Sequence, residues 1–590
     1  MEHAMRQLFL TILLLITAVV GHAADFKEIS IERLPQLHDA YIPGGYQSNI
    51  YRLQNKGDKP ANVTIRESIT YSNSINYTRT RSMALAPSTT AYLSLYSPQF
   101  QKEISLKHTP HYYLRDASCS IEINGKRQEL PNELLHMHVA NGYSGNLLLG
   151  LVSPSLPLND YKTLLGFIHE NDIVKLAASP VEQWPAHVRE YAGLSSIWIS
   201  SEDKITPEVR QALNDFVHLG GTLITIVPPE ARWPLTDVPE PHDSHIRNVG
   251  YGRIITVRPI SMQNKAALQP LIQRLNAVDR TRRNYIFNEQ ERNRYPALES
   301  LRHFSFRRSE LRDVNIPANF LETPPHTIPL FKLFLVMAVF AVIIGPLNYW
   351  YLQRKGKQLL LIFTTPVISI VFCLFVVLFI TFYEGWRSHG AACGFTLLDQ
   401  TEHRADTFAR VVMDAALRPS GGFTFSADDL VSFKGVGTID VLDAPGQIIA
   451  SSVMKPRVPL KYSVSRTEPR REQLDIAFNG DKATVTNGLG AEVASLVILS
   501  HENFLFNHDQ PLQPGETVTL HGTLRNEPPE PLTLPQIATT LFDETEAKIP
   551  YTATWLKKGQ YLAKLDEPVF YSTGMKPDLF NVTHFIIGKF

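Results

Sequence analysis

Two apolar segments in the middle of the chain constrain its fold more than any other feature. Residues 330–352 and 359–383 contain 23 and 25 residues, and Lys332 is the single charged residue within them. At 1.5 Å of rise per residue, either segment can cross a hydrocarbon core about 30 Å thick. Core helices of soluble domains are seldom so long and so uniformly apolar. The sequence therefore predicts two transmembrane helices in contact with a lipid bilayer.

The connection between these segments predicts their orientation. It spans residues 353–358 and holds three basic residues, Arg354, Lys355 and Lys357. Short loops rich in Lys and Arg remain on the cytoplasmic side of a membrane. The parts of the chain before and after the hairpin are therefore both expected outside the cytoplasm.

The start of the chain agrees with that orientation. Residues 1–23 combine one Arg with the apolar run 8–20 and end in small residues, which is typical of a secretory signal peptide cleaved after Ala23. A retained N-terminal anchor is the alternative, but the apolar run is short for a membrane span.

Composition and charge exclude several classes of protein. The chain has 590 residues, and single hydrophobic cores usually stop growing at about 250 to 300 residues, so several folded units are expected. Lys plus Arg and Asp plus Glu both number 57, which leaves no charge excess for binding nucleic acid. Three cysteines cannot form a disulfide scaffold, and no metal-binding or nucleotide-binding motif occurs, so neither a metal nor a cofactor is expected.

Two regions have the pattern of all-β structure. Residues 24–140 show short runs of alternating apolar and polar residues between Pro- and Gly-containing turns, which predicts an immunoglobulin-like β-sandwich. Residues 387–590 return to this pattern and predict a second, C-terminal β-sandwich. Cys119 and Cys393 fall one in each region, and the sequence leaves open whether they form a disulfide or remain free, buried thiols.

Residues 146–276 instead alternate apolar strands with longer helical stretches, as in an α/β unit with a parallel sheet. Its clearest helix lies within 206–220, where Thr206 suits the N-cap, Pro207 the first helical position and Gly220 the C-terminal end. The predicted fold class is therefore multidomain, α/β plus all-β, with two transmembrane helices.

One segment supports a family resemblance. Residues 195–226, SSIWISSEDKITPEVRQALNDFVHLGGTLITI, resemble the strand, helix, Gly-Gly and strand of class I glutamine amidotransferase-like domains, which have a flavodoxin-like fold. The order of all the parts resembles that of a group of bacterial membrane proteins, and residues 344–350, IGPLNYW, are similar to a signature at the end of their first span. The resemblance implies a two-pass protein of the cell inner membrane with a periplasmic body.

An active domain of that class needs a nucleophilic cysteine at a turn between a strand and a helix. No cysteine falls between residues 120 and 372, so we expect the domain to be catalytically degenerate. Ser200 or Ser201 as nucleophile, with His218 or His242 as base, is the alternative, although no Gly-x-Ser-x-Gly elbow surrounds either serine. No catalytic, cofactor-binding or metal-ligating residue is assigned.

Residues 277–329 form an Arg-rich segment that precedes the first apolar segment. Within 277–312, nine Arg and five acidic residues are interleaved with aromatic residues. Such a composition suits contact with anionic lipid head groups, with an acidic polysaccharide or with another subunit, but a solvated, salt-bridged surface is the favoured interpretation. Nucleic acid is not an expected partner outside the cytoplasm.

Together, these patterns favour an inner-membrane-anchored envelope scaffold that binds an envelope or membrane protein and is not an enzyme. The alternative is an envelope hydrolase that acts on a glycan or peptide through the α/β domain. A sensor that signals through the hairpin is a third hypothesis, but residues 353–358 would offer a cytoplasmic partner little surface.

Overall fold

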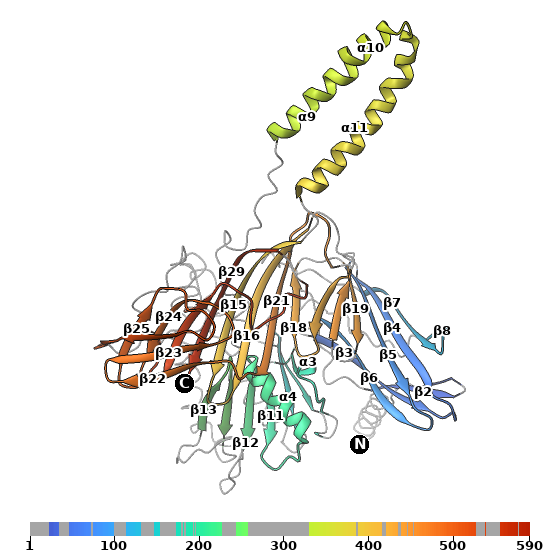
Figure 1. Ribbon diagram of the computed structural model, residues 1–590. Coiled ribbons are helices and arrows are strands. Elements are labelled where there is room, and N and C mark those ends of the chain that lie inside the picture. The colour runs from blue at the N-terminus through green and yellow to red at the C-terminus, as the bar shows by residue number, and fades with distance from the viewer. Residues whose placement is uncertain are drawn as a thin grey trace.

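The computed structural model describes residues 23–26, 28–34, 46–71, 75–98, 114–130, 147–153, 173–178, 181, 184–192, 194, 196–226, 244–257, 330–384, 388–415, 421–434, 438–444, 447–451, 453–526, 537, 555–575 and 578–590. These residues form five β-sheets and a long helical hairpin that projects from the body (Figure 1). The predicted signal peptide up to residue 22, the Arg-rich segment and His242 lie outside the described residues.

Two sheets pack face to face in the N-terminal part of the body. The first has the order β1 (Ala23–Phe26), β2 (Ile29–Arg33), β3 (Tyr46–Asn55) and β6 (Thr90–Pro98). The second contains β4 (Ala61–Tyr71), β5 (Ile75–Leu85), β7 (Leu114–Ile123) and β8 (Lys126–Glu129). Alternate residues of the strands point inward, and the core between the sheets includes Ile29, Ile31, Tyr51, Leu53, Val63, Ile65, Leu93, Leu95, Cys119 and Ile121. This arrangement is consistent with the predicted β-sandwich.

The second of these sheets continues into the C-terminal part of the chain. Its full order is β17-β20-β19-β5-β4-β7-β8, and the three added strands are β17 (Phe423–Ser426), β19 (Thr438–Ala444) and β20 (Gln447–Ser451). β19 runs parallel to β5, with Ile439 opposite Tyr77. The expected division into a unit of 24–140 and a unit of 387–590 therefore cuts through one sheet. The periodicity of a strand does not reveal which distant strand it pairs with, so this pairing cannot be predicted from the sequence pattern.

A six-stranded, largely parallel sheet forms the middle of the body. Its order is β10 (Ile173–Ala178), β9 (Leu147–Val152), β11 (Ser196–Ser200), β12 (Thr222–Ile226), β14 (Gly252–Val257) and β13 (Ser244–Val249), and only β13 is antiparallel to its neighbour. The short helix α3 (Val188–Tyr191) precedes β11, and α4 (Pro207–His218) connects β11 to β12. Thr206 caps α4 by accepting a hydrogen bond from the backbone N–H of Val209. The helix predicted within 206–220 is therefore confirmed.

The largest sheet has nine strands, all from the C-terminal part of the chain. Its order is β18 (Leu430–Lys434), β21 (Leu460–Pro469), β16 (Arg404–Asp414), β15 (His389–Asp399), β29 (Asp578–Lys589), β28 (Gln560–Leu565), β24 (Val493–Leu499), β25 (Phe504–His508) and β27 (Thr523–Leu524). A three-stranded sheet of β22 (Gln473–Asn479), β23 (Lys482–Gly488) and β26 (Thr517–His521) packs against one end of it through a second apolar core.

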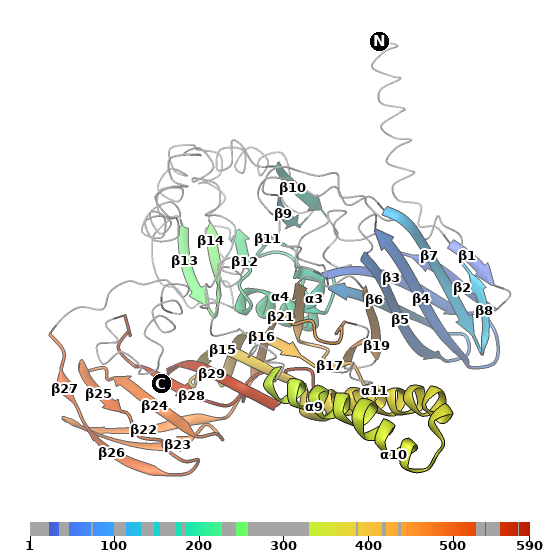
Figure 2. The same ribbon diagram turned by 90° about the horizontal axis from the view of Figure 1, so that it is seen from above.

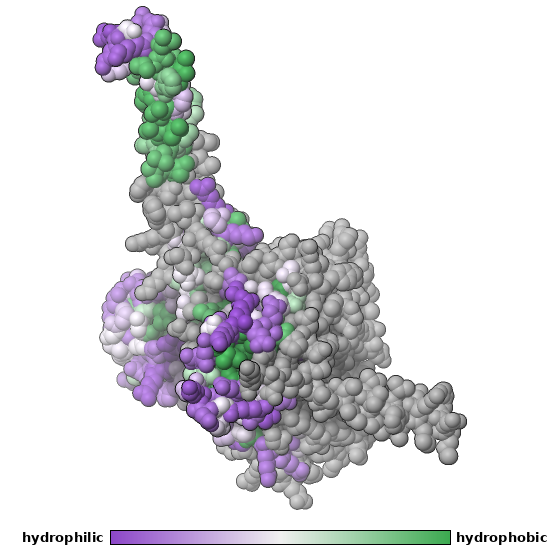
Figure 3. Space-filling view, turned by 90° about the vertical axis from the view of Figure 1, so that its right-hand side faces the viewer, coloured by the Kyte–Doolittle hydropathy of each residue, from purple (hydrophilic) through white to green (hydrophobic). Residues whose placement is uncertain are grey.

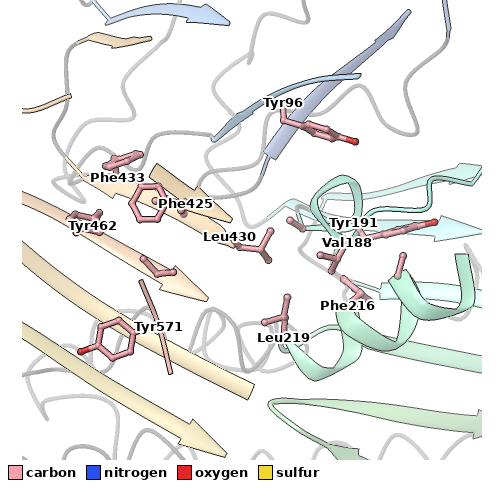
Figure 4. Close-up of a cluster of buried hydrophobic side chains, with 14 of the residues drawn as sticks. Tyr96, Val188, Tyr191, Phe216, Leu219, Phe425, Leu430, Phe433, Tyr462 and Tyr571 are labelled. Atoms are coloured by element: carbon pink, nitrogen blue, oxygen red, sulfur yellow. The ribbon is translucent and has the colours of Figure 1, made fainter. Parts of the chain in front are cut away.

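One apolar cluster joins the three parts of the body, which are the N-terminal sandwich, the parallel sheet with its helices, and the nine-stranded sheet with its neighbouring strands. It combines side chains from β6, from α3 and α4, and from β17, β18 and β21, as Figure 4 shows for Tyr96, Tyr191, Phe216, Leu430 and Tyr462. Seen from above, α3 and α4 lie on the side of the parallel sheet that faces the nine-stranded sheet (Figure 2). The body is therefore held by a shared core, in addition to the cores of its separate sheets.

The hairpin consists of two antiparallel helical arms. The first runs through α9 (Leu330–Val342), the π-helical turn η4 (Ile343–Leu347) and α10 (Asn348–Arg354), and the second through η5 (Gln358–Leu360) and α11 (Leu361–Glu384). Pro346 lies in the π-helical turn, where a residue without a backbone N–H interrupts the regular helical hydrogen bonds. The stretches Phe334–Arg354 and Gln358–Leu378 are long and apolar enough to cross a membrane, which agrees with the two predicted apolar helices.

Candidate functional site

The surface of the hairpin is apolar along most of its length (Figure 3). Large side chains on both arms are exposed, among them Phe334, Leu335, Ile362, Ile370 and Leu374. Contiguous apolar surfaces of this size are rare on soluble monomers and mark sites of contact with a membrane or a partner. The hairpin is therefore the most distinctive interaction surface in the described part of the chain.

Two contacts hold the arms of the hairpin together. The rings of Phe340 and Phe372 stack with their centroids 3.9 Å apart. Nearer the tip, the amide of Asn348 donates a hydrogen bond to Oγ1 of Thr364 over 3.0 Å, and that hydroxyl lies 3.2 Å from the amide oxygen. Polar contacts of this kind link helices in lipid, where no water competes for them.

The tip of the hairpin is basic and aromatic. The guanidinium of Arg354 lies 3.6 Å from the ring centroid of Trp350, and the ammonium of Lys355 lies 4.6 Å from that of Tyr351. Trp and Tyr beside basic residues are typical of the boundary between a membrane and water. The tip thus has the chemistry expected at a membrane surface.

The two serines considered as nucleophiles belong to an ordinary turn after β11. Oδ2 of Asp203 accepts a hydrogen bond from the backbone N–H of Ser200 over 2.8 Å, and Oγ of Ser200 accepts one from Glu202 over 3.3 Å. Oγ of Ser201 is buried without a hydrogen-bond partner among the described residues. This pattern is that of a local turn, in which side chains satisfy backbone groups.

His218 lies far from these serines. The helix α4 begins six residues after Ser201, and His218 is the last of its 12 residues, about 16 Å along the helix axis from Pro207. His218 is therefore at the amino end of β12, whereas Ser200 is at the carboxyl end of β11, where ligands of parallel sheets bind. The geometry does not bring His218 together with Ser200 or Ser201 as base and nucleophile.

His218 instead joins the parallel sheet to the nine-stranded sheet. Its Nδ1 lies 2.7 Å from Oδ2 of Asp406 on β16, and both side chains are buried. Oδ1 of the same carboxylate accepts a hydrogen bond from Thr467 over 2.6 Å. Buried carboxylates of this kind are stable only when such partners replace water.

The same joint contains an ion pair between arginine and aspartate. Arg404, also on β16, binds Asp215 of α4 and donates a hydrogen bond from Nε to Thr467 over 2.9 Å. Burial raises the pKa of Asp215 more than its pairing with Arg404 lowers it. Nearby, the hydroxyl of Tyr251 donates to the carbonyl oxygen of Phe395 on β15 over 2.7 Å. These contacts fix α4 and the start of β14 against the large sheet.

A third group of polar contacts lies where all three parts of the body meet. The hydroxyl of Tyr96 on β6 donates a hydrogen bond to Oε1 of Glu190 on α3 over 2.8 Å. Arg189 lies over the Tyr96 ring, 5.0 Å from its centroid, and hydrogen-bonds to the carbonyl oxygen of Ala427 between β17 and β18. Burial raises the pKa of Glu190 to about 7, although the hydrogen bond from Tyr96 and the charge of Arg189 both lower it.

The N-terminal sandwich contains a fully buried ion pair of its own. Glu67 on β4 lies opposite Arg79 on β5, and their side chains are 2.6 Å apart. Glu67 also accepts hydrogen bonds from Asn49, over 2.8 Å, and from Tyr51 on the facing sheet. The pair thus links the two sheets of the sandwich, and no feature of it indicates a reaction.

The cysteines are free thiols. Cys119 belongs to the core of the N-terminal sandwich and Cys393 to a core beside β15, so they do not form a disulfide. Burial raises the pKa of the Cys119 thiol to about 12, and it also raises the pKa of Cys393. Both thiols are therefore poor nucleophiles.

Asp406, Arg404 and Glu190 could not be picked out from the sequence. They lie within a β-strand or a short helix, and no motif marks them. A carboxylate among the apolar residues of a strand, as in the segment 404–414, was the one available signal. In the part of the chain that the structure describes, no group of three or more His, Cys, Asp or Glu residues could hold a metal ion.

Comparisons with known proteins leave the family open. No family model matches the chain, and no curated protein matches it. Among solved structures, the yeast delta-COP-I mu-homology domain matches with 8% identity and a TM-score of 0.19, over 34% of this chain and 96% of that one. Bacteroides uniformis beta-glucuronidase 2, covalently bound to cyclophellitol-6-carboxylate aziridine, matches with 11% identity and a TM-score of 0.13, over 36% of this chain and 24% of that one. TM-scores this low do not establish a shared fold.

Proposed function

We propose that this protein is a scaffold of the bacterial envelope, anchored in the inner membrane by its hairpin, with a periplasmic body that binds another envelope or membrane protein. The observation that carries the proposal is the way in which the hairpin is inserted into the body. The strands β5 and β19, which precede and follow the hairpin, pair within one sheet. A hairpin that crosses a membrane must therefore leave both flanking parts on the same side.

The basic tip supports the orientation of that anchor. Arg354, Lys355 and Lys357 fall at the end of α10 and in its connection to η5. The α10 end of the hairpin is the part farthest from the body in Figure 1. Retention of short basic loops in the cytoplasm supports a periplasmic position for the body.

We further propose that the parallel sheet belongs to a flavodoxin-like, amidotransferase-like domain without activity. Taken in sequence order, its five parallel strands follow the pattern 2-1-3-4-5, which is the flavodoxin-like order. The separation of His218 from Ser200 and Ser201, and the use of His218 in a buried contact with Asp406, support a structural role for these residues.

Reporter fusions test the topology. Alkaline phosphatase is active only after export, so a fusion after Phe590 is expected to be active and one inserted at Gly356 inactive. A fluorescent protein that folds only in the cytoplasm should give the opposite result at each position. Cytoplasmic exposure of a reporter after Phe590 would contradict the shared-side arrangement.

Crosslinking in cells, followed by purification of the tagged full-length protein in mild detergent and mass spectrometry, tests the scaffold function. We expect a reproducible envelope or membrane protein in near-stoichiometric amount. The matched control is the Ser200→Ala, Ser201→Ala double variant, which should capture the same partner because neither serine contributes chemistry. Recovery of the protein alone with several crosslinkers would contradict a scaffold role. Accumulation of an uncleaved glycan or peptide in cells with the double variant would favour a hydrolase.

A further inference from the structure

The turn between β20 and β21 lies at the end of the body from which the hairpin emerges. β15 begins at His389, five residues after the last residue of α11, so the two points are at most about 18 Å apart. His389 lies opposite Asp414 at the end of β16, and Met413 lies opposite Leu460 at the start of β21. The start of β21 is therefore at the same end of the sheet, two strands or roughly 10 Å to the side of β15.

This turn is strongly basic and partly apolar. Residues 453–461 contain Lys455, Arg457 and Lys461 and no acidic residue. All three basic residues are exposed, and Val458 between two prolines is 50% exposed. Lys434, at the end of β18, lies opposite Lys461 and adds a fourth basic position at the same end of the sheet.

The turn has a fixed shape. Val453, Met454 and Leu460 are buried on either side of it. The backbone N–H of Arg457 donates a hydrogen bond to the carbonyl oxygen of Ala415 over 2.8 Å, which ties the turn to the end of β16. Arg457 has a φ of 59°, a left-handed conformation that costs a non-glycine residue conformational energy. The fold thus presents these basic side chains from a rigid support.

We propose that residues 455–461, called here the basic turn, dock the body onto the anionic phospholipid head groups of the membrane that holds the hairpin. The inference rests on the proposed anchoring of the hairpin. Lys455, Arg457 and Lys461 bind the phosphates, and Val458 enters the interface between head groups and acyl chains. Attraction between basic side chains and anionic lipid acts within a Debye length of the membrane surface, about 8 to 10 Å. The short connection from α11 to β15 allows this end of the body to come that close to the membrane. The contact fixes the tilt of the body relative to the membrane.

A fluorescent probe on the basic turn tests the proposal. The full-length protein carries Cys373→Ser, because the other two cysteines are buried, and Val458→Cys labelled with an environment-sensitive NBD group. It is incorporated into vesicles of phosphatidylcholine alone or of phosphatidylcholine with phosphatidylglycerol. We expect the NBD emission to shift to the blue and its quenching by an aqueous quencher to fall several-fold only in the anionic vesicles. The triple variant Lys455→Glu, Arg457→Glu, Lys461→Glu should abolish both changes.

Controls at the opposite end of the body separate this contact from general effects. Lys557 and Lys558 are exposed beside β28, and Gln560 lies opposite Lys589 at the end of β29 that is far from the hairpin. A probe on Lys558→Cys should be quenched equally in both lipids, and Lys557→Glu with Lys558→Glu should leave the signal at position 458 intact. Equal quenching at position 458 in both lipids, or no effect of the triple variant, would contradict docking by the basic turn. The proposed membrane anchor would be unaffected by that result. Failure of the protein to float with either vesicle would overturn the anchor and the docking together.

Discussion

Nδ1 of His218 lies 2.7 Å from Oδ2 of Asp406, although the hairpin separates the two residues in the sequence. The contact is buried and belongs to a network in which Arg404 and Thr467 also take part. It makes the position of the parallel sheet depend on a strand that follows the hairpin. The two flanking parts of the chain thus form one body, and this unity can be tested residue by residue.

Replacing Asp406 by Ala should destabilise the joint between α4 and β16. The change leaves buried polar atoms of His218 and Thr467 without this partner and removes the carboxylate 3.8 Å from Arg404, and breaking a buried charged contact typically costs about 3 to 5 kcal/mol. Denaturant unfolding of the purified protein, followed by tryptophan fluorescence, would measure the loss. Glu402→Gln is the control, because Glu402 pairs with Arg247 at 3.5 Å on the surface, and exposed pairs contribute at most about 1 kcal/mol. Equal effects of the two substitutions would contradict the assigned role of Asp406.

Gly250→Ala should also weaken this joint. Gly250 has a φ of 53°, and a Cβ atom there would lie 2.3 Å from Oδ2 of Asp406 and 2.8 Å from the carbonyl oxygen of His218. Gly125→Ala is the matched control, since Gly125 has a φ of 82° and no atom within 4 Å of such a Cβ. Gly125→Ala measures the cost of the left-handed backbone conformation alone, about 1 to 2 kcal/mol. Gly250→Ala should lower the midpoint of thermal unfolding more than Gly125→Ala does, because it adds a steric clash. A smaller decrease in the unfolding midpoint for Gly250→Ala than for Gly125→Ala would show that Gly250 does not lie so close to Asp406 and His218.

The buried carboxyl of Glu190 predicts a pH dependence of stability. Its pKa is about 7 in the folded protein and about 4.3 in an unfolded chain, so the folded state binds the extra proton. The stabilisation from this proton is complete below the unfolded pKa and is lost as pH rises from about 4.3 to about 7, by at most about 3 to 4 kcal/mol. Burial raises the pKa of Tyr96, which donates to this carboxyl, so its hydroxyl keeps its proton throughout this range.

Glu190→Gln isolates that contribution. Denaturant unfolding at pH 4.5, 5.5, 6.5 and 7.5 should give free energies that fall less steeply in the variant than in the unaltered protein, with a difference approaching one proton per molecule near pH 5.5. The comparison is needed because other buried groups titrate in the same range. Burial raises the pKa of Asp429 to about 6, which adds a slope of the same sign, and lowers the pKa of His584 to about 3, which adds a slope of the opposite sign. Parallel curves for the two proteins would show that Glu190 ionises normally.

Cutting the hairpin loop should leave the two halves of the protein together. Gly356 has a φ of 68° and open space around it, so a short site for a specific protease can be inserted there. After cleavage, the fragments should elute together from a sizing column in mild detergent and separate in denaturant, because β19 pairs with β5. The variant Phe340→Ala, Asn348→Leu removes contacts between the helical arms and should not change the result. Separate elution of the fragments in mild detergent would refute the shared sheet.

The thiols of Cys119 and Cys393 should resist alkylation until the protein unfolds. Both are buried and their pKa values are raised, so few thiolates are present at neutral pH. Mass spectrometry after treatment with N-ethylmaleimide should show both residues unmodified in the native protein and modified in denaturant. A disulfide would instead leave both unmodified under each condition.

The sequence predicted those elements whose signal is local. The apolar segments gave the hairpin to within a few residues, and the capping residues Thr206 and Pro207 gave α4 nearly to its ends. Alternating residues indicated β structure on both sides of the hairpin. Each of these signals is contained within about 25 consecutive residues, because the periodicity of a helix or strand is a property of the segment itself.

The pairing of distant segments could not be predicted in the same way. Nothing in residues 438–444 indicates that they pair with β5, because a strand that completes a distant sheet has the same periodicity as one that pairs nearby. The partners of His218 show the same limit. The sequence offered His218 only as a candidate base for Ser200 or Ser201, and its contact with Asp406 is visible only once β16 lies beside α4.

The parallel pairing of β19 with β5 also determines when the protein can finish folding. Roughly 360 residues separate Tyr77 from Ile439, and at about 5 to 20 residues per second their synthesis takes about twenty seconds to a minute. Throughout that interval β5 has an open edge, which is prone to pair with other chains. With the hairpin inserted as proposed, β19 reaches β5 only after the chain has crossed the membrane twice. A hairpin inserted incorrectly would leave β19 in the wrong compartment, so completion of this sheet serves as a check on membrane insertion.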